Sequence, residues 1–262
     1  MAQAVPFLGL DFDPLTQDEV LEVIERLSVA PRFSYVVTPN VDHLVQIHAP
    51  GTEEAVPDAF RRADLRVCDS RVLQLLARRS GLDLPLVTGS DLTAHLVERM
   101  QRTAGQVAVI GGDQALLAGL KRRYPAVRWE QFEPPMGVRR NPDAQAAIAR
   151  FVAHSEARIF LFAIGAPQSE IVCARIAELG EAHGVALCIG ASLEFLTGAK
   201  RRAPRVLQQL KLEWLFRLLS EPGRLWRRYL VEGPRIFLIW RRWRLSAARQ
   251  GAGSGSSRFD GV

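Results

Sequence analysis

The feature that most constrains the fold is a repeated switch from a short apolar run, through a glycine or polar turn, to an amphipathic helical pattern. The two clearest units are residues 107–123, with the turn Gly-Gly-Asp, and residues 158–179, with the turn Gly-Ala-Pro. Short apolar runs between helical patterns are typical of the buried strands of a parallel sheet. The alternation predicts an α/β fold, with a mostly parallel, Rossmann-like sheet and helices on both of its faces.

Other segments of the chain repeat this rhythm. The expected strands are 7–11, Phe33–Val37, 65–68 and 185–189, and the expected helices are 16–27, Val41–Ile47, 72–76 and 92–102. A chain of 262 residues is long enough for one large α/β domain with an appendage. We predict a donor-binding and catalytic domain over 1–198, a basic helical C-terminal appendage over 199–246, and a disordered tail over 247–262.

Polar residues and glycines that follow strands are expected to gather at one edge of the sheet, because parallel strands end together. The predicted set is Thr38, Asn40, Asp69, Gly111, Gly112, Gly165, Pro167, Gly190 and Glu194. Glycines let a ligand approach the backbone, and helix N-termini favour anions, so the set indicates a nucleotide-diphosphate site. Turn formation alone also favours glycine after a strand, and the chain has neither a GxGxxG nor a GxxxxGK[ST] motif, so the nucleotide stays unnamed.

Asp69 ends the strand expected at 65–68 and stands directly before a helical pattern. One interpretation is a catalytic base that takes a proton from an attacking hydroxyl group. The other is a helix N-cap, which position alone favours. Asp42 is the second candidate base, and Asp91 is expected to cap the helix that it begins.

The cysteines and the N-terminus indicate a protein of the cytoplasm. Cys68, Cys173 and Cys188 lie in apolar patterns without a CxxC motif, which argues for buried free thiols rather than disulfides or a zinc site. The N-terminus lacks the basic start of a signal peptide, and no apolar run reaches the ~18 residues of a membrane span. We expect neither a metal nor another cofactor.

Residues 200–244 carry 13 Lys and Arg but three Glu, whereas residues 1–199 are mildly acidic. The apolar run at 236–240 is too short to span a bilayer but suits its interface, and tryptophan is enriched at headgroup depth. The tryptophans of this region are Trp214, Trp226, Trp240 and Trp243. We predict an anionic membrane surface as a partner. A solvated basic face packed on the body is the plainer alternative, and nucleic acid ranks lower because the chain offers no identifiable stacking platform.

Several short motifs, taken in order and spacing, match one family. They are TPNVDH at 38–43, the strand-end Asp69, TGSDL at 88–92, VIGG at 109–112, GAPQSE at 165–170, IGASLEFLTG at 189–198, and RAP, LEWLFRL, EP and RRY within 202–229. Across residues 7–229 the chain resembles the WecG/TagA/CpsF glycosyltransferases. These enzymes move a sugar from a UDP-sugar to a lipid-diphosphate-linked acceptor at the cytoplasmic membrane face.

The resemblance implies an inverting transfer, with Asp69 as the base and Asn40, beside Thr38, at the donor sugar. It places Glu194 near the nucleotide, and we expect the other donor contacts at Gly111, Gly112, Gly165, Gln168 and Gly190. It places the acceptor diphosphate at Arg202, Arg217, Arg224 and Arg228. The expected partners are therefore a UDP-sugar and a polyprenyl-diphosphate-linked sugar, and the expected location is peripheral, on the inner face of the cell membrane.

Three positions depart from the family pattern. Asp69-Ser70 stands where Asp-Gly is common, Gln168-Ser169-Glu170 stands where Lys-Gln-Glu is common, and Glu194 stands where Asp is usual. These departures indicate an exopolysaccharide branch that transfers glucose or a related hexose. The alternative is a non-enzymatic adapter that uses the basic segment to bind membrane or nucleic acid. Monomer and homo-oligomer both remain open.

Overall fold

The structure, a computed structural model, describes residues 3–199, 218–219, 223 and 226–253. Its centre is a six-stranded sheet in the order β4-β3-β8-β7-β5-β6, in which every neighbouring pair is parallel. The strands are β3 (Phe33–Val37), β4 (Leu65–Arg66), β5 (Gln106–Ile110), β6 (Arg128–Phe132), β7 (Ile159–Phe162) and β8 (Gly184–Cys188). The expected Rossmann-like α/β fold is confirmed.

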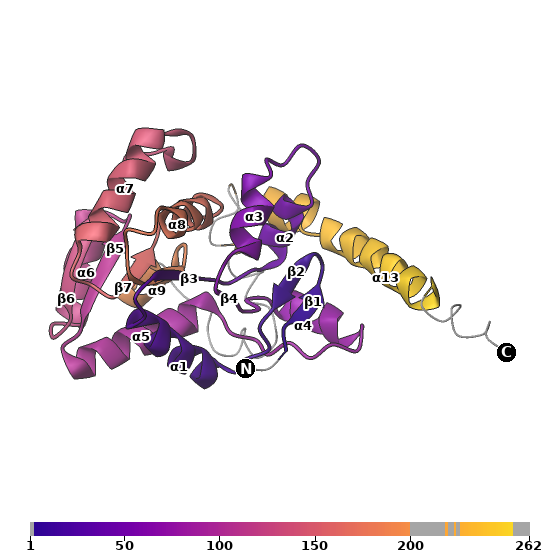
Figure 1. The fold of residues 1–262 in the computed structure, drawn as a ribbon, viewed down its shortest axis with the longest axis horizontal. Coiled ribbons are helices and arrows are strands. Elements are labelled where there is room, and N and C mark those ends of the chain that lie inside the picture. Colours follow the sequence, from indigo (N-terminus) through magenta and orange to yellow (C-terminus); the bar gives the residue numbers. More distant parts are fainter. Residues whose placement is uncertain (1–2, 200–217, 220–222, 224–225, 254–262) are drawn as a thin grey trace.

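Helices cover both faces of this sheet (Figure 1). One face carries α2 (Val41–Ile47), α3 (Ala55–Arg61), α7 (Pro142–His154) and α8 (Gln168–Leu179). The other carries α1 (Gln17–Ser28), α5 (Gly89–Thr103), α6 (Gln114–Arg123) and α9 (Ser192–Thr197). Successive residues of β8 alternate between the two cores, because neighbouring side chains of a strand point to opposite faces. The central strand is therefore buried on both sides and apolar throughout.

The register aligns the carboxyl ends of the inner strands. Cys188 of β8 pairs with Val37 of β3 and with Phe162 of β7, and Phe162 pairs in turn with Ile110 of β5. The connection after β5 leads outward to β6, whereas the connection after β7 leads the opposite way to β8. This reversal makes a crevice between the ends of β5 and β7, the position where open α/β sheets bind ligands.

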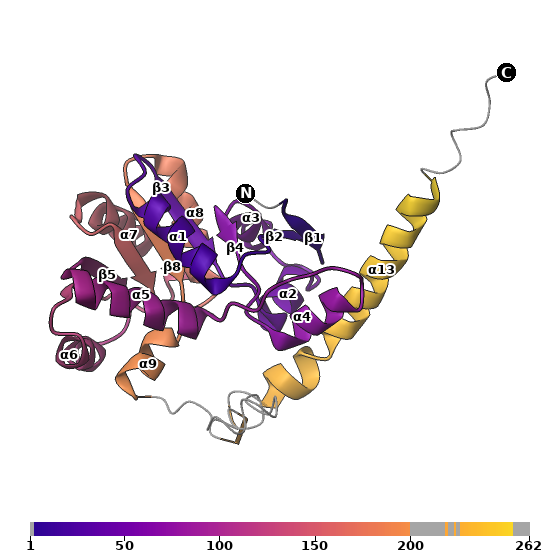
Figure 2. The ribbon, with the colours of Figure 1, turned by 90° about the horizontal axis from the view of Figure 1, so that it is seen from below.

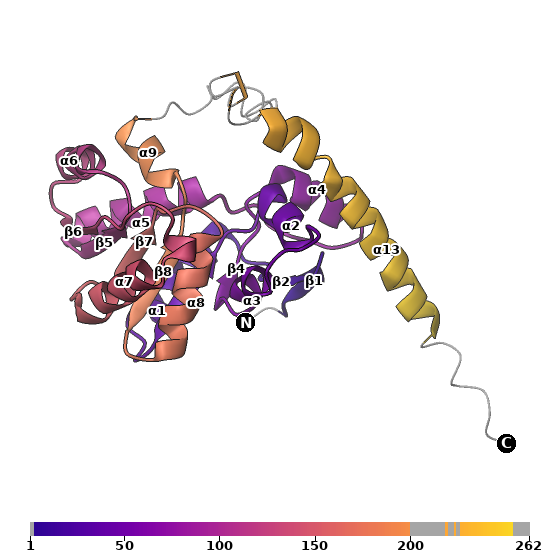
Figure 3. The ribbon, with the colours of Figure 1, turned by 90° about the horizontal axis from the view of Figure 1, so that it is seen from above.

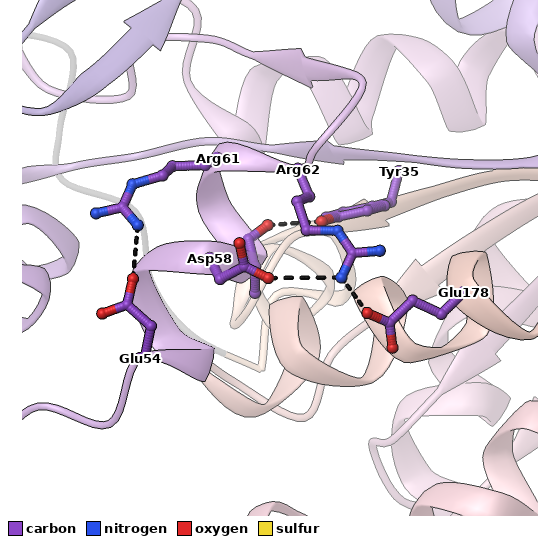
Figure 4. Close-up of polar contacts among 7 residues, drawn as sticks. Tyr35, Glu54, Asp58, Arg61, Arg62 and Glu178 are labelled. Carbon is purple, nitrogen blue, oxygen red and sulfur yellow. Dashed lines mark hydrogen bonds and ion pairs between the residues drawn. The ribbon is translucent and has the colours of Figure 1, made fainter.

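Polar contacts fix α3 to the sheet and to α8 (Figure 4). The buried hydroxyl of Tyr35 on β3 donates to the Ala59 carbonyl at 2.6 Å, and burial raises the pKa of this phenol. Arg62, which follows α3, bridges Asp58 and Glu178 of α8. These contacts hold α3 and α8 on one face of the sheet.

The prediction of a single strand at 7–11 is wrong. The segment instead forms a two-stranded antiparallel hairpin outside the main sheet, with β1 (Val5–Phe7) and β2 (Leu10–Phe12). Leu8 and Gly9 between the strands both have positive φ, at 52° and 81°. A two-residue turn of this kind reverses the chain, so the apolar run cannot continue as one strand.

Residues 124–157 carry no expected element, yet they form β6, the short 3-10 helix η1 (Val138–Arg140) and α7. β6 is an edge strand with the sequence RWEQF, and its side chains are exposed or half-buried. An edge strand lacks the continuous apolar run that marks the inner strands, so its pattern is weak.

The C-terminal part contains η2 (Arg227–Glu232), a π-helix, and α13 (Arg235–Gly253). Figures 2 and 3 show α13 running past α2 and α4 (Arg71–Arg78) and then extending beyond the body. The helix includes residues 247–253, which were expected to belong to a disordered tail. The long helix replaces the short interfacial piece expected at 236–240.

One face of α13 packs on the body. Ile236 is 1% exposed, and Ile239, Trp240 and Trp243 pack against the core, at the spacing of one helical face. Trp240 Nε1 donates to Ser80 Oγ at 2.9 Å, and the Trp243 ring meets the Phe7 ring edge-on with centroids 5.2 Å apart. The core thus covers part of Trp240 and Trp243, and their expected place at headgroup depth stays a prediction.

Candidate active site

A cavity of about 2640 Å³ lies at the carboxyl ends of the strands. Its lining includes nearly every predicted donor and catalytic residue: Thr38, Asn40, Asp69, Gly111, Gly112, Gly165, Gln168, Gly190 and Glu194. Arg228 of η2 also lines it. Arg202, Arg217 and Arg224, predicted to bind the acceptor diphosphate, lie outside the described residues, as does Trp214.

Asp69 does not cap the helix that follows it. Ser70 is the N-cap of α4, and its hydroxyl accepts from the Leu73 N–H at 3.3 Å. The Asp69 carboxylate instead accepts from the Gly89 N–H, at the start of α5, at 3.1 Å. The prediction that Asp69 caps the following helix is thus wrong. Ser70 caps α4, and the Asp69 carboxylate lies at the cavity wall.

The side chains of Asp69 and Thr38 both lie beside Gly89, at the start of α5. A methyl group placed on Gly89 would lie 3.2 Å from Thr38 Oγ1, 3.4 Å from Asp69 Oδ2 and 3.7 Å from Ser192 Oγ. The cap of α5 is Thr88, whose Oγ1 accepts from the Asp91 N–H at 3.1 Å, so the predicted cap at Asp91 is also wrong. Gly89 therefore allows two oxygen-bearing side chains from separate strands to converge.

We expect Gly89→Ala to lower turnover about tenfold, because displacement of catalytic groups by a fraction of an ångström is costly and a full ångström costs ~100-fold. The added methyl must push Thr38 or Asp69 by a few tenths of an ångström. Gly89 is the first residue of α5, where alanine is well tolerated, so the melting temperature should not fall. A loss of activity that parallels a loss of stability would contradict this view of the site.

Asn40 and His43 form a capping box at the start of α2. The Asn40 Oδ1 accepts from the Asp42 and His43 N–H groups at 3.0 and 3.3 Å, and the Asn40 N–H donates to His43 Nδ1 at 3.3 Å. Burial, and then the charge of Arg228, lowers the pKa of His43 to about 3, so the ring stays neutral. The amide oxygen of Asn40 is thus engaged by the protein, and its NH₂ group is the part suited to a donor.

The glycine turns after β5 and β7 lie against each other at the crevice. Gly111 has φ 101°, and a side chain there would meet Ile164 Cγ2 at 2.8 Å and the Ala163 carbonyl carbon at 3.1 Å. By contrast, a side chain on Gly165 or Gly190 would meet no atom of the described residues within 4 Å. Gly111 therefore serves the contact between the two turns, while Gly165 and Gly190 border the cavity with room on that side for a ligand, as far as the described residues go.

Gln168 begins α8, and its Nε2 donates to the Ile164 carbonyl, so its amide nitrogen is engaged by the protein. Glu194 lies in the first turn of α9 at the cavity wall. These two predicted donor contacts come from the turns after the neighbouring strands β7 and β8, on the same side of the crevice.

Arg228 forms an ion pair with Asp42, the second candidate base, with Nη2 3.0 Å from Oδ2. Gln46 donates to the same oxygen at 2.9 Å. Burial raises the pKa of Asp42, and the Arg228 charge opposes that shift. Asp42 is therefore placed to hold an arginine of the C-terminal appendage at the cavity, rather than to act as a base.

Glu170, which the sequence analysis did not select, is a buried acid in the wall of the same cavity. It is 2% exposed, and among the described residues its Oε2 has no hydrogen-bond partner. Burial raises its pKa from 4.5 to about 7. A single Glu in a helix start gives no sequence signal of this kind, because its burial depends on how α8 meets β8.

Glu170 should make stability depend on pH near neutrality. Its raised folded-state pKa means that the folded protein binds this proton more tightly, so the stabilisation is full below about pH 4.5 and is lost as the pH rises through about 7. Because one pKa unit corresponds to about 1.4 kcal/mol, we expect a loss on the order of 3 kcal/mol.

Urea unfolding of the wild type and of Glu170→Gln at pH 5 and pH 8 measures this effect. The free energy of unfolding of the wild type should fall relative to that of the variant between pH 5 and pH 8, because Gln does not titrate. A difference that stays constant across this range would show that Glu170 does not titrate there.

Within the described ranges, no group of three or more His, Cys, Asp or Glu side chains is arranged to hold a metal ion. The three cysteines are free and buried. No helix of the part of the chain that the structure describes is long and apolar enough to cross a bilayer.

Comparison with known protein families gives one match. The model described as "Glycosyl transferase WecG/TagA/CpsF family" matches residues 5–250. The matched range runs from the N-terminal hairpin, through the whole cavity wall, into α13.

Proposed function

The chain belongs to the WecG/TagA/CpsF family of glycosyltransferases, and from this we propose that it moves a hexose from a UDP-sugar, with inversion, to a polyprenyl-diphosphate-linked sugar. Family membership makes the protein a glycosyltransferase that acts in the synthesis of cell-surface polymers. The exopolysaccharide pathway, the UDP-sugar donor and the hexose are parts of the proposal.

The observation that carries the proposal is the position of Asp69. Its carboxylate does not cap α4, the helix that follows it, and it borders the same cavity as the glycine turns after β5 and β7. An inverting transfer needs a base on one side of the anomeric carbon and the leaving group on the other. With the nucleotide at the crevice and Asp69 after β4, the ends of β8 and β3 lie between them, where the sugar ring would sit.

In the proposed step, the acceptor hydroxyl oxygen attacks the anomeric carbon, and its proton passes to the Asp69 carboxylate. The bond from the anomeric carbon to the β-phosphate oxygen breaks, and its electron pair leaves with UDP. The Gly89 N–H holds the carboxylate in place. Backbone N–H groups of the glycine turns are suited to the negative charge that develops on the diphosphate of UDP.

The C-terminal appendage supplies the acceptor side in this proposal. Arg228 reaches the cavity, and α13 carries exposed apolar and basic side chains next to its body-facing stripe. We place the protein on the inner face of the cell membrane, where α13 meets anionic lipid. We also propose that the reaction needs no metal, and an EDTA control tests this.

The deciding experiment is UDP release by the purified protein with a panel of UDP-sugars and a short-chain polyprenyl-diphosphate-sugar acceptor. We expect release that depends on the acceptor, occurs with one donor, and resists EDTA. Absence of release with every donor and acceptor would overturn the proposed function.

The second candidate is a non-enzymatic adapter, favoured by the exposed arginines of α13, Arg241, Arg242 and Arg244. DNA binding that weakens steeply with salt, in a protein without transferase activity, would support the adapter. Liposome binding does not separate the two functions, because both use the same basic helix.

A further inference from the structure

Glu170 is a buried acid without a structural task that the described residues reveal. It is the third residue of α8, and it lies in the cavity wall with Oε2 unpartnered among the described residues. Burying a polar group without a hydrogen bond costs about 1–3 kcal/mol. Such a cost calls for a partner that the described residues do not supply.

The usual task of a Glu at this helical position is closed to it. The third residue of a helix commonly reaches back to the N–H of the N-cap residue. The N-cap of α8 is Pro167, which has no N–H group, and it makes no side-chain cap. The N-cap therefore offers the carboxyl group no hydrogen bond. The N–H of Glu170 itself contributes one, and Oε2 stays without a partner among the described residues, open to a group in the cavity.

The topology tells which part of a ligand would pass Glu170. Glu170 lines the cavity together with Cys188, the last residue of β8, and its charge adds to the burial that raises the pKa of the Cys188 thiol. β8 lies between β7, at the crevice, and β3, which ends at Thr38. A ligand that runs from the crevice to Asp69 must cross the end of β8 and so pass Glu170.

We propose that Glu170 is a specificity residue that hydrogen-bonds a hydroxyl group of the transferred sugar. This inference rests on the proposed function, which puts a nucleotide at the crevice and the anomeric carbon near Asp69. A diphosphate is a poor partner for a carboxyl group, because an ionised carboxylate repels it. A sugar hydroxyl both donates and accepts, so it can pair with the carboxyl group whether or not Glu170 carries its proton.

The test is calorimetric titration of UDP and of UDP-hexoses into the wild type, Glu170→Ala and Glu170→Gln. In Glu170→Ala, we expect affinity for the recognised UDP-hexose to fall about tenfold, while affinity for UDP stays unchanged. Glu170→Gln retains hydrogen-bonding atoms and should keep most of the affinity. Glu181→Ala removes an exposed Glu beyond the other end of α8 and should change neither ligand.

Three results would overturn the inference: equal losses for UDP and UDP-hexose, wild-type affinity in Glu170→Ala, or no UDP-hexose binding by the wild type. The readout is binding, so it is separate from the reaction. A selective loss in Glu170→Ala without transfer by the wild type would keep this inference and reject the proposed function. Sugar transfer by the wild type, without a selective loss of UDP-hexose affinity in Glu170→Ala, would keep the proposed function and reject this inference.

Discussion

Asp69→Asn should lower the rate of acceptor-dependent UDP release about 10²–10⁴-fold, the usual contribution of a positioned general base. Asparagine keeps the size of the side chain, and its amide oxygen can still accept from the Gly89 N–H, as the carboxylate does at 3.1 Å. It cannot take the proton of the attacking hydroxyl group. Donor affinity, measured by calorimetry, should therefore stay near that of the wild type.

Ser70→Ala is the matched control for this variant. It removes the hydroxyl that caps α4, so it should cost about 1 kcal/mol of stability while leaving the reaction rate nearly unchanged. The pair separates a chemical role at Asp69 from a structural role one residue later. Normal turnover by Asp69→Asn would reject the assignment of the base.

Phe237→Ser combined with Leu238→Ser should weaken binding to vesicles that contain anionic lipid by about 100-fold. Full burial of each such side chain is worth about 1.5–3 kcal/mol, and the protein already buries about half of each, so the membrane would bury the other half. The two side chains are 52% and 58% exposed and lie outside the packed stripe of α13, Phe237 at the rim of the cavity and Leu238 on the opposite side of the helix. Arg241 and Arg242 beside them are exposed and would meet lipid phosphates. Sedimentation with vesicles measures the loss.

Val29→Ser provides the control for the double variant, because Val29 is an exposed apolar residue after α1. It should leave vesicle binding unchanged. Because neither Phe237 nor Leu238 belongs to the packed stripe, the melting temperature of the double variant should also stay near that of the wild type. Unchanged vesicle binding in the double variant would mean that this face of α13 does not meet the membrane.

Much of the sheet could be predicted because its strands are buried on both faces. The strand Phe33–Val37 and the helices Val41–Ile47, Gln114–Arg123 and Gln168–Leu179 were predicted with the bounds that the structure has. In each case an apolar run and a clear turn or cap act together. β6 and the N-terminal hairpin were missed or wrong, since an edge strand and a two-residue turn leave weaker patterns.

The site divides in the same way. Strand-end residues such as Asp69 and Asn40 could be predicted to share an edge, because parallel topology places them there. The sequence pattern could not show which of two neighbouring polar residues caps a helix. Ser70 and Thr88 are the caps, in place of Asp69 and Asp91. The burial of Glu170 and the pairing of Arg228 with Asp42 depend on contacts between distant segments, which local patterns do not contain.

The docking of α13 on Phe7 and Ser80 has a consequence for the order in which the protein is completed. Ribosomes build a chain from its amino end, so both docking positions exist long before Trp240 and Trp243 are made. The nascent body must therefore carry an uncovered apolar surface around the hairpin until the last helix emerges.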